Sequence, residues 1–256
     1  MTEVRGSNES GEEAQIFQEA IDSFDVKEAN FDFGKNASPL REGIQSTGLL
    51  LLGEIHGVAE NANVIYTLFK KFGFRTLALE WPKSMQGAVD SFLETGKLDF
   101  SAIQGSADGR VTAGHFAVMR KLKQEGILHR VVCIDDGDMS NWNDRDENMA
   151  KNVAAVLPDG PVLVVAGNLH TRTSSIDIDG QTHHPMGEHI RKRVPNAPVA
   201  TLDYLSGEYE NSGRQYFKKR SPNVPTRGSV RQSHPNEYII EIPKASGAIV
   251  PSPVSG

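Results

Sequence analysis

The sequence predicts an α/β fold with a mainly parallel central sheet flanked by helices. Apolar runs without polar alternation recur along the chain, as in strands that are covered on both faces. Segments with helical periodicity lie between these runs, and several end at a glycine. Such an alternation is typical of βαβ units. We expect a single domain over residues 13–243, with disordered tails at 1–12 and 244–256.

Five apolar runs are predicted to be strands of this sheet. The first contains four consecutive leucines between glycines. The predicted strands span residues 47–54, 76–81, 130–136, 161–168 and 198–205. Because the first and fourth runs lack alternation, we expect them to be parallel members of the same sheet. Residues 236–242 are predicted to form a last strand, at an edge.

Helices are predicted where apolar residues recur at helical spacing. One covers residues 65–72 and stops at Gly73, and a second covers 85–93 and stops at Gly96. Further helices are predicted over 115–126, over 149–157 and over 186–193. Residues 83–128 contain helix without a strand, so we expect a helical insertion near the site.

Two short patterns predict local structure around the later helices. Asp144 and Glu147 have the spacing of a capping box, which would open the helix that Pro158 stops. Asp179-Gly180 lies between two short polar–apolar segments and predicts a hairpin.

Composition bounds the partners and the compartment. Lys and Arg total 27 against 33 Asp and Glu, a net charge of −6, and no block of basic residues suggests nucleic-acid binding. The single cysteine, Cys133, lies in an apolar run and predicts a buried thiol. The polar start lacks the pattern of a signal peptide, and no run reaches the length of a membrane span. We expect a cytoplasmic protein with a small-molecule substrate and no nucleic-acid or membrane partner; a homodimer stays open.

Ionisable residues follow the predicted strands, at the sheet edge where ligands of open α/β sheets bind. The first strand ends in Gly53-Glu54-Ile55-His56 and the fourth in Gly167-Asn168-Leu169-His170, so both carry a Gly-x-x-His motif. The second ends in Glu80-Trp81 and the third in Asp135-Asp136. We expect His56, Glu80 and His170 to converge in one cleft.

No motif for a nucleophile or a phosphate loop is present. The chain lacks Gly-x-Ser-x-Gly, Gly-x-Gly-x-x-Gly, a Gly-Lys-Ser/Thr loop, His-Glu-x-x-His and any cysteine pair. The natural chemistry is then activated water, with a histidine or carboxylate accepting its proton. His56, Glu80 and His170 could instead bind a divalent metal.

Other polar residues keep two interpretations at this stage. Arg145 begins the helix after the third strand and could point at the crevice or at solvent. His115 opens a helix, and its role stays open. His183, His184 and His189 lie in or near the predicted hairpin, where a polar surface is the simpler interpretation.

At GEIHG, LALEW, NDRDENMAKN, AGNLHT and MGEHI the chain resembles the erythromycin esterase, ChaN-like and Tiki superfamily, over roughly residues 45–205. By position, His56 resembles the general base of that family and Glu54 its companion. Glu80 resembles the carboxylate that holds the base, and His170 matches the second motif. Arg145 resembles the arginine at the helix start.

The resemblance implies three activities. The esterase branch hydrolyses a macrolide ester with activated water, the Tiki branch contains metal-dependent peptidases, and the ChaN-like branch binds haem. We expect a hydrolase-like protein acting on an ester or amide of a small molecule. The alternatives are a haem- or cofactor-binding protein without turnover, for which Met186, Tyr204 and the histidines offer ligands, and a metal-dependent peptidase.

Overall fold

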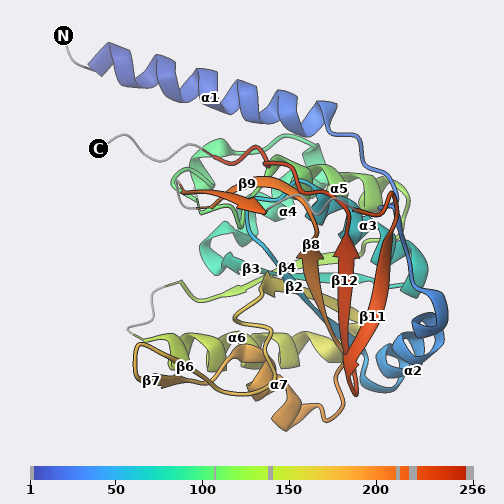
Figure 1. The fold of residues 1–256 in the computed structure, drawn as a ribbon. Helices are drawn as coiled ribbons and strands as arrows, with labels where there is room; N and C mark the ends of the chain where they lie inside the picture. Colours follow the sequence, from blue (N-terminus) through green and yellow to red (C-terminus); the bar gives the residue numbers. More distant parts are fainter. Residues whose placement is uncertain (1–2, 107, 138–140, 212–213, 219–223, 252–256) are drawn as a thin grey trace.

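The computed structural model describes residues 3–106, 108–137, 141–211, 214–218 and 224–251. In this part of the chain, an eight-stranded sheet runs through the molecule with helices on both faces (Figure 1). Its strand order is β1-β11-β12-β8-β2-β5-β3-β4, and all neighbours are parallel except β11 and β12. The predicted fold class, a mainly parallel α/β sheet, is confirmed.

The strands of this sheet are β1 (Phe31–Asp32), β2 (Leu49–Glu54), β3 (Thr76–Pro82), β4 (Arg130–Asp135), β5 (Val162–Gly167), β8 (Val199–Tyr204), β11 (Gly228–His234) and β12 (Glu237–Ile242). The two runs expected to be parallel are direct neighbours, because β2 pairs with β5 from Leu49↔Val162 to Glu54↔Gly167. Both motifs therefore leave the sheet side by side.

The predicted edge position of residues 236–242 is wrong. Strand β12 lies between β8 and the antiparallel β11. Outside β11, the short β1 forms the edge. Most side chains of β11 are exposed, and its sequence is polar. The search for apolar runs therefore did not predict this strand.

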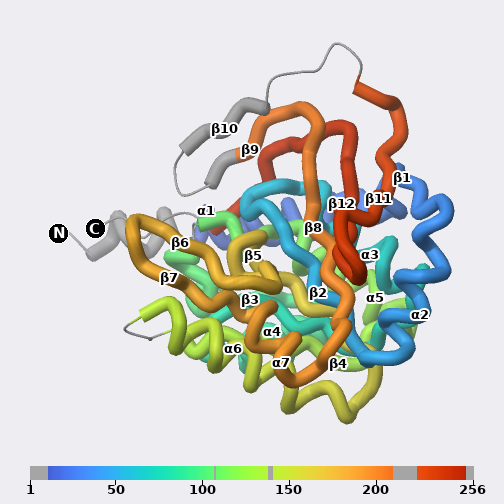
Figure 2. Tube along the Cα trace, turned by 60° about the horizontal axis from the view of Figure 1, so that its bottom comes forward, coloured from blue at the N-terminus to red at the C-terminus, as the bar shows by residue number. Residues whose placement is uncertain are grey.

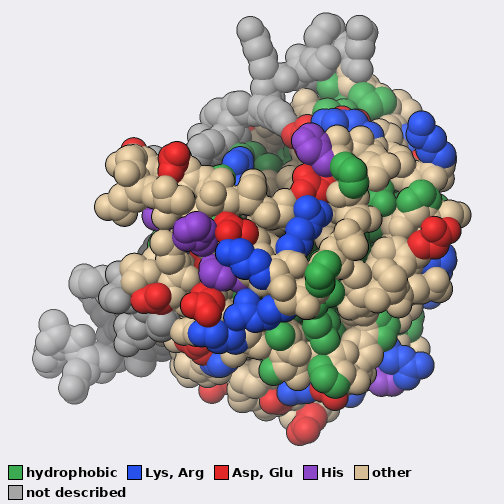
Figure 3. All heavy atoms as spheres, turned by 90° about the horizontal axis from the view of Figure 1, so that it is seen from below, with side chains coloured by type: hydrophobic (Ala, Val, Ile, Leu, Met, Phe, Trp, Pro, Cys, Tyr) green, Lys and Arg blue, Asp and Glu red, His purple; other side chains and the backbone are tan. Residues whose placement is uncertain are grey.

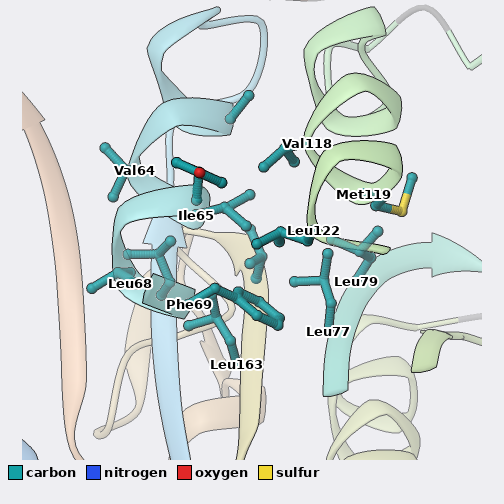
Figure 4. Close-up of a cluster of buried hydrophobic side chains, with 14 of the residues drawn as sticks. Val64, Ile65, Leu68, Phe69, Leu77, Leu79, Val118, Met119, Leu122 and Leu163 are labelled. Atoms are coloured by element: carbon teal, nitrogen blue, oxygen red, sulfur yellow. The ribbon is translucent and has the colours of Figure 1, made fainter. Parts of the chain in front are cut away.

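Helices α1 (Glu3–Ser23), α2 (Ala37–Thr47), α3 (Glu60–Phe72), α4 (Gln86–Thr95) and α5 (Ala113–Gln124) contribute to one core cluster. In Figure 4, Phe69 of α3 and Leu122 of α5 lie over Leu77 and Leu163 of the sheet. The opposite face is covered by α6 (Trp142–Val156) and α7 (Met186–Arg193), and the hairpin of β6 (Ile176–Ile178) and β7 (Gln181–His183) lies beside them (Figure 2).

Shorter elements complete the fold. Single 3-10 turns lie at Gly34–Asn36, Lys83–Met85, Phe100–Ala102 and Leu157–Asp159. A separate antiparallel pair is formed by β9 (Gly207–Asn211) and β10 (Arg214–Lys218).

Two helix ends and the hairpin turn have the backbone conformations that the sequence predicts. Helices α3 and α4 end before Gly73 and Gly96, whose φ angles of 72° and 73° are left-handed, as predicted for glycine stops. The predicted hairpin turn is confirmed at Asp179 and Gly180, which both have positive φ and so give the twist that a two-residue turn needs.

The capping prediction for α6 is wrong. The helix begins at Trp142, and Asn141 caps it by accepting a hydrogen bond from the Asp144 N–H at 2.9 Å. Asp144 is therefore in the first turn, where a carboxylate is favoured by the helix dipole.

Both predicted tails differ from the structure. Helix α1 begins at Glu3, so residues 3–12 are helical. Residues 244–251 form a strap across the protein: the Ala59 N–H donates to Ser246 O and the Ala113 N–H to Ile249 O. The hydrogen-bond partners of this segment lie far away in the sequence, so its composition does not predict that it is ordered. Residues 1–2 and 252–256 lie outside the described part.

Residues 83–128 form the crossover between the parallel neighbours β3 and β4. Its helices α4 and α5 belong to the layer over the sheet, and its loop approaches the strand ends. Cys133 is buried, and burial together with the charge of Asp90 raises the pKa of its thiol to about 12, in agreement with the predicted buried thiol. Across the described residues, no helix combines the length and apolarity that crossing a membrane requires.

Candidate active site

The residues predicted at three strand ends converge on one carboxylate, that of Glu80 on β3. The His56 Nε2 lies 3.8 Å from Glu80 Oε2, and the His170 Nε2 lies 3.4 Å from Glu80 Oε1. At these separations the three side chains share one site, as expected from the sequence.

Glu80 is buried and held from several sides. Arg145 Nη2 donates to Oε1 at 2.8 Å, the Gly167 N–H donates to Oε2 at 2.7 Å, and Arg110 Nη1 is 3.5 Å from Oε1. Burial by itself would raise the pKa of Glu80, but the charges of the neighbouring histidines and arginines outweigh it and lower that pKa to about 2. Glu80 is therefore a fixed negative charge at the centre of the cluster.

Arg145 points at the crevice and not at solvent. From the first turn of α6 its Nε and Nη2 donate to the two oxygens of Asp135, at 3.0 and 2.7 Å, as well as to Glu80. Burial disfavours the charged guanidinium, but the hydrogen bonds with Asp135 and the charge of Glu80 prevail and raise the pKa of Arg145. The arginine is permanently charged and links the ends of β3 and β4.

Arg110 adds a second guanidinium that the sequence did not indicate. It comes from the loop before α5, and its Nη1 donates to Asp135 Oδ2 at 3.2 Å. Its Nε contacts Asp108, which shares the loop. A single arginine in a polar, glycine-containing loop belongs to no recognisable sequence motif. Arg110 lies at the site only because the crossover between β3 and β4 folds over the strand ends.

His170 is buried between two carboxylates. Its Nδ1 is 2.8 Å from Asp146 Oδ1, and its Nε2 faces Glu80. Burial alone would lower the pKa of His170, but Glu80 and Asp146 outweigh it and raise that pKa. The Nε2 also lies 3.3 Å from Arg145 Nη1, a contact in which only the neutral ring could accept. The charges of the two carboxylates outweigh that of the one guanidinium, so they favour the charged imidazolium.

His56 has a different environment. Its Nε2 is buried but has no hydrogen-bond partner among the described residues, with Glu54 Oε1 at 4.0 Å and Glu80 Oε2 at 3.8 Å. Its side chain retains 14% exposure. A buried nitrogen without a partner costs free energy unless a water or a ligand satisfies it. The geometry therefore leaves His56 Nε2 available to a small polar molecule.

A third histidine, His115, joins the cluster behind Glu54. It lies in the first turn of α5, its Nε2 is 3.4 Å from Glu54 Oε2, and its Nδ1 is 2.9 Å from the Thr112 hydroxyl. Neither Glu54 Oε2 nor His115 Nε2 has a hydrogen bond among the described residues. Glu54 thus lies between His56 and His115. The sequence feature that could have identified His115 is its place on the buried face of a helix.

Three further histidines, His183, His184 and His189, lie in the β6–β7 hairpin, in α7 or between them. His184 Nδ1 is 3.1 Å from Glu188 Oε2, and Lys192 binds the same carboxylate. Figure 3 shows histidines among acidic and basic side chains on this face. His189 packs edge-on to His184, and burial lowers its pKa. His183 packs against Trp142, which in turn contacts His170.

The cluster does not fit a metal centred on Glu80. No group of three or more His, Cys, Asp or Glu side chains in the described ranges has the arrangement of a metal site. The two oxygens of Glu80 already receive Arg145 and the Gly167 N–H, with Arg110 close by, so a metal ion there would have to displace or face positive charge.

Two of the haem-ligand candidates are buried side chains. Met186 is fully buried in the core beneath α7, and the buried Tyr204 hydroxyl donates to Asn61. Neither presents a ligand atom to an open space, as an axial ligand of haem must.

The fold and the cluster define a mainly parallel α/β protein with histidines and carboxylates gathered at the carboxyl ends of β2, β3 and β5. The family model for erythromycin esterase matches residues 117–203, which include Arg145 and His170. The predicted resemblance to the erythromycin esterase superfamily is thereby confirmed. No curated protein matches the chain by sequence.

Solved structures share this fold at low sequence identity. A mutant of the erythromycin esterase EreC in its open conformation is 12% identical, with a TM-score of 0.61 over 82% of this chain and 93% of that one. A succinoglycan biosynthesis protein is 11% identical, with a TM-score of 0.58 over 92% and 99%. A Bacillus cereus protein is 11% identical, with a TM-score of 0.56 over 94% and 99%.

Proposed function

We propose that this protein is a hydrolase that activates water at His56 and cleaves an ester or amide of a small molecule. One observation carries the proposal: His56 Nε2 is a buried nitrogen with no hydrogen-bond partner in the described part of the chain, placed between the carboxylates of Glu54 and Glu80. A neutral imidazole there can accept a proton from water, and the two carboxylates then stabilise the imidazolium that forms.

The reaction needs one water and one carbonyl substrate. His56 takes a proton as the water oxygen bonds to the carbonyl carbon, and the carbonyl oxygen becomes an oxyanion. Arg110 and the charged His170 are the positive groups suited to stabilise that oxyanion. When the carbon–oxygen or carbon–nitrogen bond breaks, the leaving group receives the proton from His56, giving an acid and an alcohol or amine.

Glu80 and Arg145 are positioning residues in this scheme. Glu80 is locked by Arg145 and the Gly167 N–H, so its charge cannot turn away from His56. Glu54 and His115 support the other side of His56. A fixed electrostatic environment of this kind lowers the reorganisation that the transition state requires.

The name of the matching family supports an ester as the bond that is cleaved. The test is a panel of small esters and amides with the purified protein, with and without added Mn²⁺ or Zn²⁺. His56→Ala should lower kcat by about 10²-fold or more, the usual scale for removal of a general base. His234→Ala is the matched control, because His234 is exposed on β11 and outside the cluster.

The melting temperatures of both variants should stay close to that of the parent protein. A folded His56→Ala variant with full activity would contradict the proposal. Activity that appears only with added metal would favour a metal-dependent peptidase instead.

A further inference from the structure

A cavity beside the cluster has no role in the scheme above. It has a volume of about 520 Å³ and lies between the start of α6 and the β6–β7 hairpin. Pockets of this size take small organic ligands. The lining residues used below are Asn141, Trp142, Asn143, Gln181, Thr182 and His183.

Trp142 connects this cavity to the proposed active site. It is 40% exposed although it is the largest type of apolar side chain, and its ring centroid is 5.5 Å from that of His170. It also lines a second cavity of about 410 Å³ together with Arg110 and Arg145. A molecule on the Trp142 ring would therefore lie next to the cluster.

His183 supplies an independent sign of a ligand. Its ring packs against Trp142 at 5.2 Å, and its buried Nδ1 has no hydrogen-bond partner in the described part of the chain. A buried nitrogen without a hydrogen bond destabilises the folded protein. A ligand hydroxyl, which can both donate and accept, would remove that cost whichever tautomer the ring adopts.

The chemistry of the lining selects a neutral ligand. Asn141, Asn143, Gln181 and Thr182 are uncharged groups that donate and accept, and the described residues that line the cavity include no Lys or Arg. A phosphate or carboxylate would lack a cation among them. The acid in this described lining, Asp179, is exposed at the hairpin tip, so it offers a cationic ligand no buried counter-charge.

We propose that this cavity binds a sugar ring, stacked through its C–H face on Trp142 with its hydroxyls on the amides and His183. This inference rests on the proposed hydrolase activity. The substrate is then an acylated sugar whose acyl group reaches the second cavity beside Arg110. An aromatic face and neutral hydrogen-bonding groups are the two features that a polyhydroxylated ring requires.

The kinetic test compares acetylated methyl glycosides of glucose, galactose, mannose and rhamnose with cyclohexyl acetate, which has a ring of similar size without hydroxyls. At least one sugar ester should have a kcat/KM about 10-fold or more above that of cyclohexyl acetate. Trp142→Ala should abolish this preference, and Trp142→Phe, which keeps a ring, should preserve most of it. A preference that is absent, or unchanged in Trp142→Ala, overturns the inference.

A binding test separates this inference from the hydrolase. The chain has two tryptophans, and Trp81 is buried. Titration with the methyl glycosides should change the emission of Trp142, and calorimetry should show at least a 10-fold weaker Kd in Trp142→Ala. Sugar binding without hydrolysis of any ester would overturn the proposed function alone. Ester hydrolysis that depends on His56, with no response to any glycoside, would overturn the sugar site alone.

Discussion

The two Gly-x-x-His motifs share a sequence pattern and a register, but their histidines have different environments. They follow β2 and β5, which pair so that Glu54 stands opposite Gly167. His170 has both ring nitrogens at carboxylates, whereas His56 Nε2 has no hydrogen-bond partner among the described residues. The same motif thus produces one paired histidine and one available histidine.

The glycines of the two motifs explain their close approach. A Cβ on Gly167 would lie 3.1 Å from His56 Nε2, and a Cβ on Gly53 would lie 2.4 Å from Thr171 Oγ1 and 2.6 Å from Asn168 Oδ1. Each glycine makes room for the other motif. A side chain at Gly53 would therefore displace the second motif, and one at Gly167 would crowd the His56 ring.

A third element creates the difference between the histidines. Asp146 in α6 accepts from the Met186 N–H at 2.7 Å and lies 2.8 Å from His170 Nδ1, whereas Glu80 and Glu54 lie 3.8 and 4.0 Å from His56 Nε2. The strand ends place both rings near Glu80, and Asp146 of α6 adds to the effect of Glu80 in raising the pKa of His170.

Removal of the carboxylate shared by both histidines should have the largest effect. Glu80→Gln leaves the buried Arg145 with less compensation, and breaking a buried pair costs about 3–5 kcal/mol. Urea unfolding measures the loss. Glu54→Gln is the matched control and should cost clearly less, since no hydrogen bond to Glu54 Oε2 is lost. Equal costs would mean that Glu80 is no more central than Glu54.

Exchange of each histidine tests the comparison directly. His170→Gln leaves Asp146 without its charged partner and should lower the free energy of unfolding by about 1.5–3 kcal/mol. His56→Gln removes no hydrogen bond within the described residues and should cost less than about 1 kcal/mol. Similar losses for the two variants would show that both histidines are structural.

The pH dependence of stability should carry the signature of His170. Its pKa is raised in the folded state above the unfolded value of about 6.5. Its contribution is therefore complete below pH 6.5 and is lost as the pH rises through the folded pKa. Urea unfolding between pH 6 and 9 should show this decline in the parent protein and a weaker one in His170→Gln. Parallel curves for the two proteins would rule out a charged His170.

The smallest effect is expected at the support of His115. Thr112 caps α5 by accepting from the His115 N–H and also contacts His115 Nδ1. Thr112→Val should cost about 1 kcal/mol of stability, the usual value for a lost cap. Thr112→Ser keeps the hydroxyl and should retain the melting temperature within the error of thermal denaturation. A Thr112→Val protein as stable as the parent would show that the Thr112 cap does not stabilise α5.

The sequence predicted the central strands of the sheet and the edge that carries the candidate site. Apolar runs without alternation identified β2 and β5 as parallel neighbours, and the glycines at 73 and 96 marked two helix ends. These features are local, because a buried strand needs apolar side chains and a left-handed C-cap favours glycine. The elements that were missed, such as β11 and the strap at 244–251, are polar or irregular and depend on distant backbone partners.

The sequence by itself determined which strands carry His56, Glu80 and His170 and that these ends meet, since parallel strands place their carboxyl ends at one edge. Only the tertiary structure decided what surrounds each side chain. Arg110 reaches the site from a crossover loop and His115 from a helix of one layer, while Asp146 reaches His170 from a helix of the other. Charge and pairing at the site arise from contacts between segments that are far apart in the chain, and no local pattern encodes those contacts.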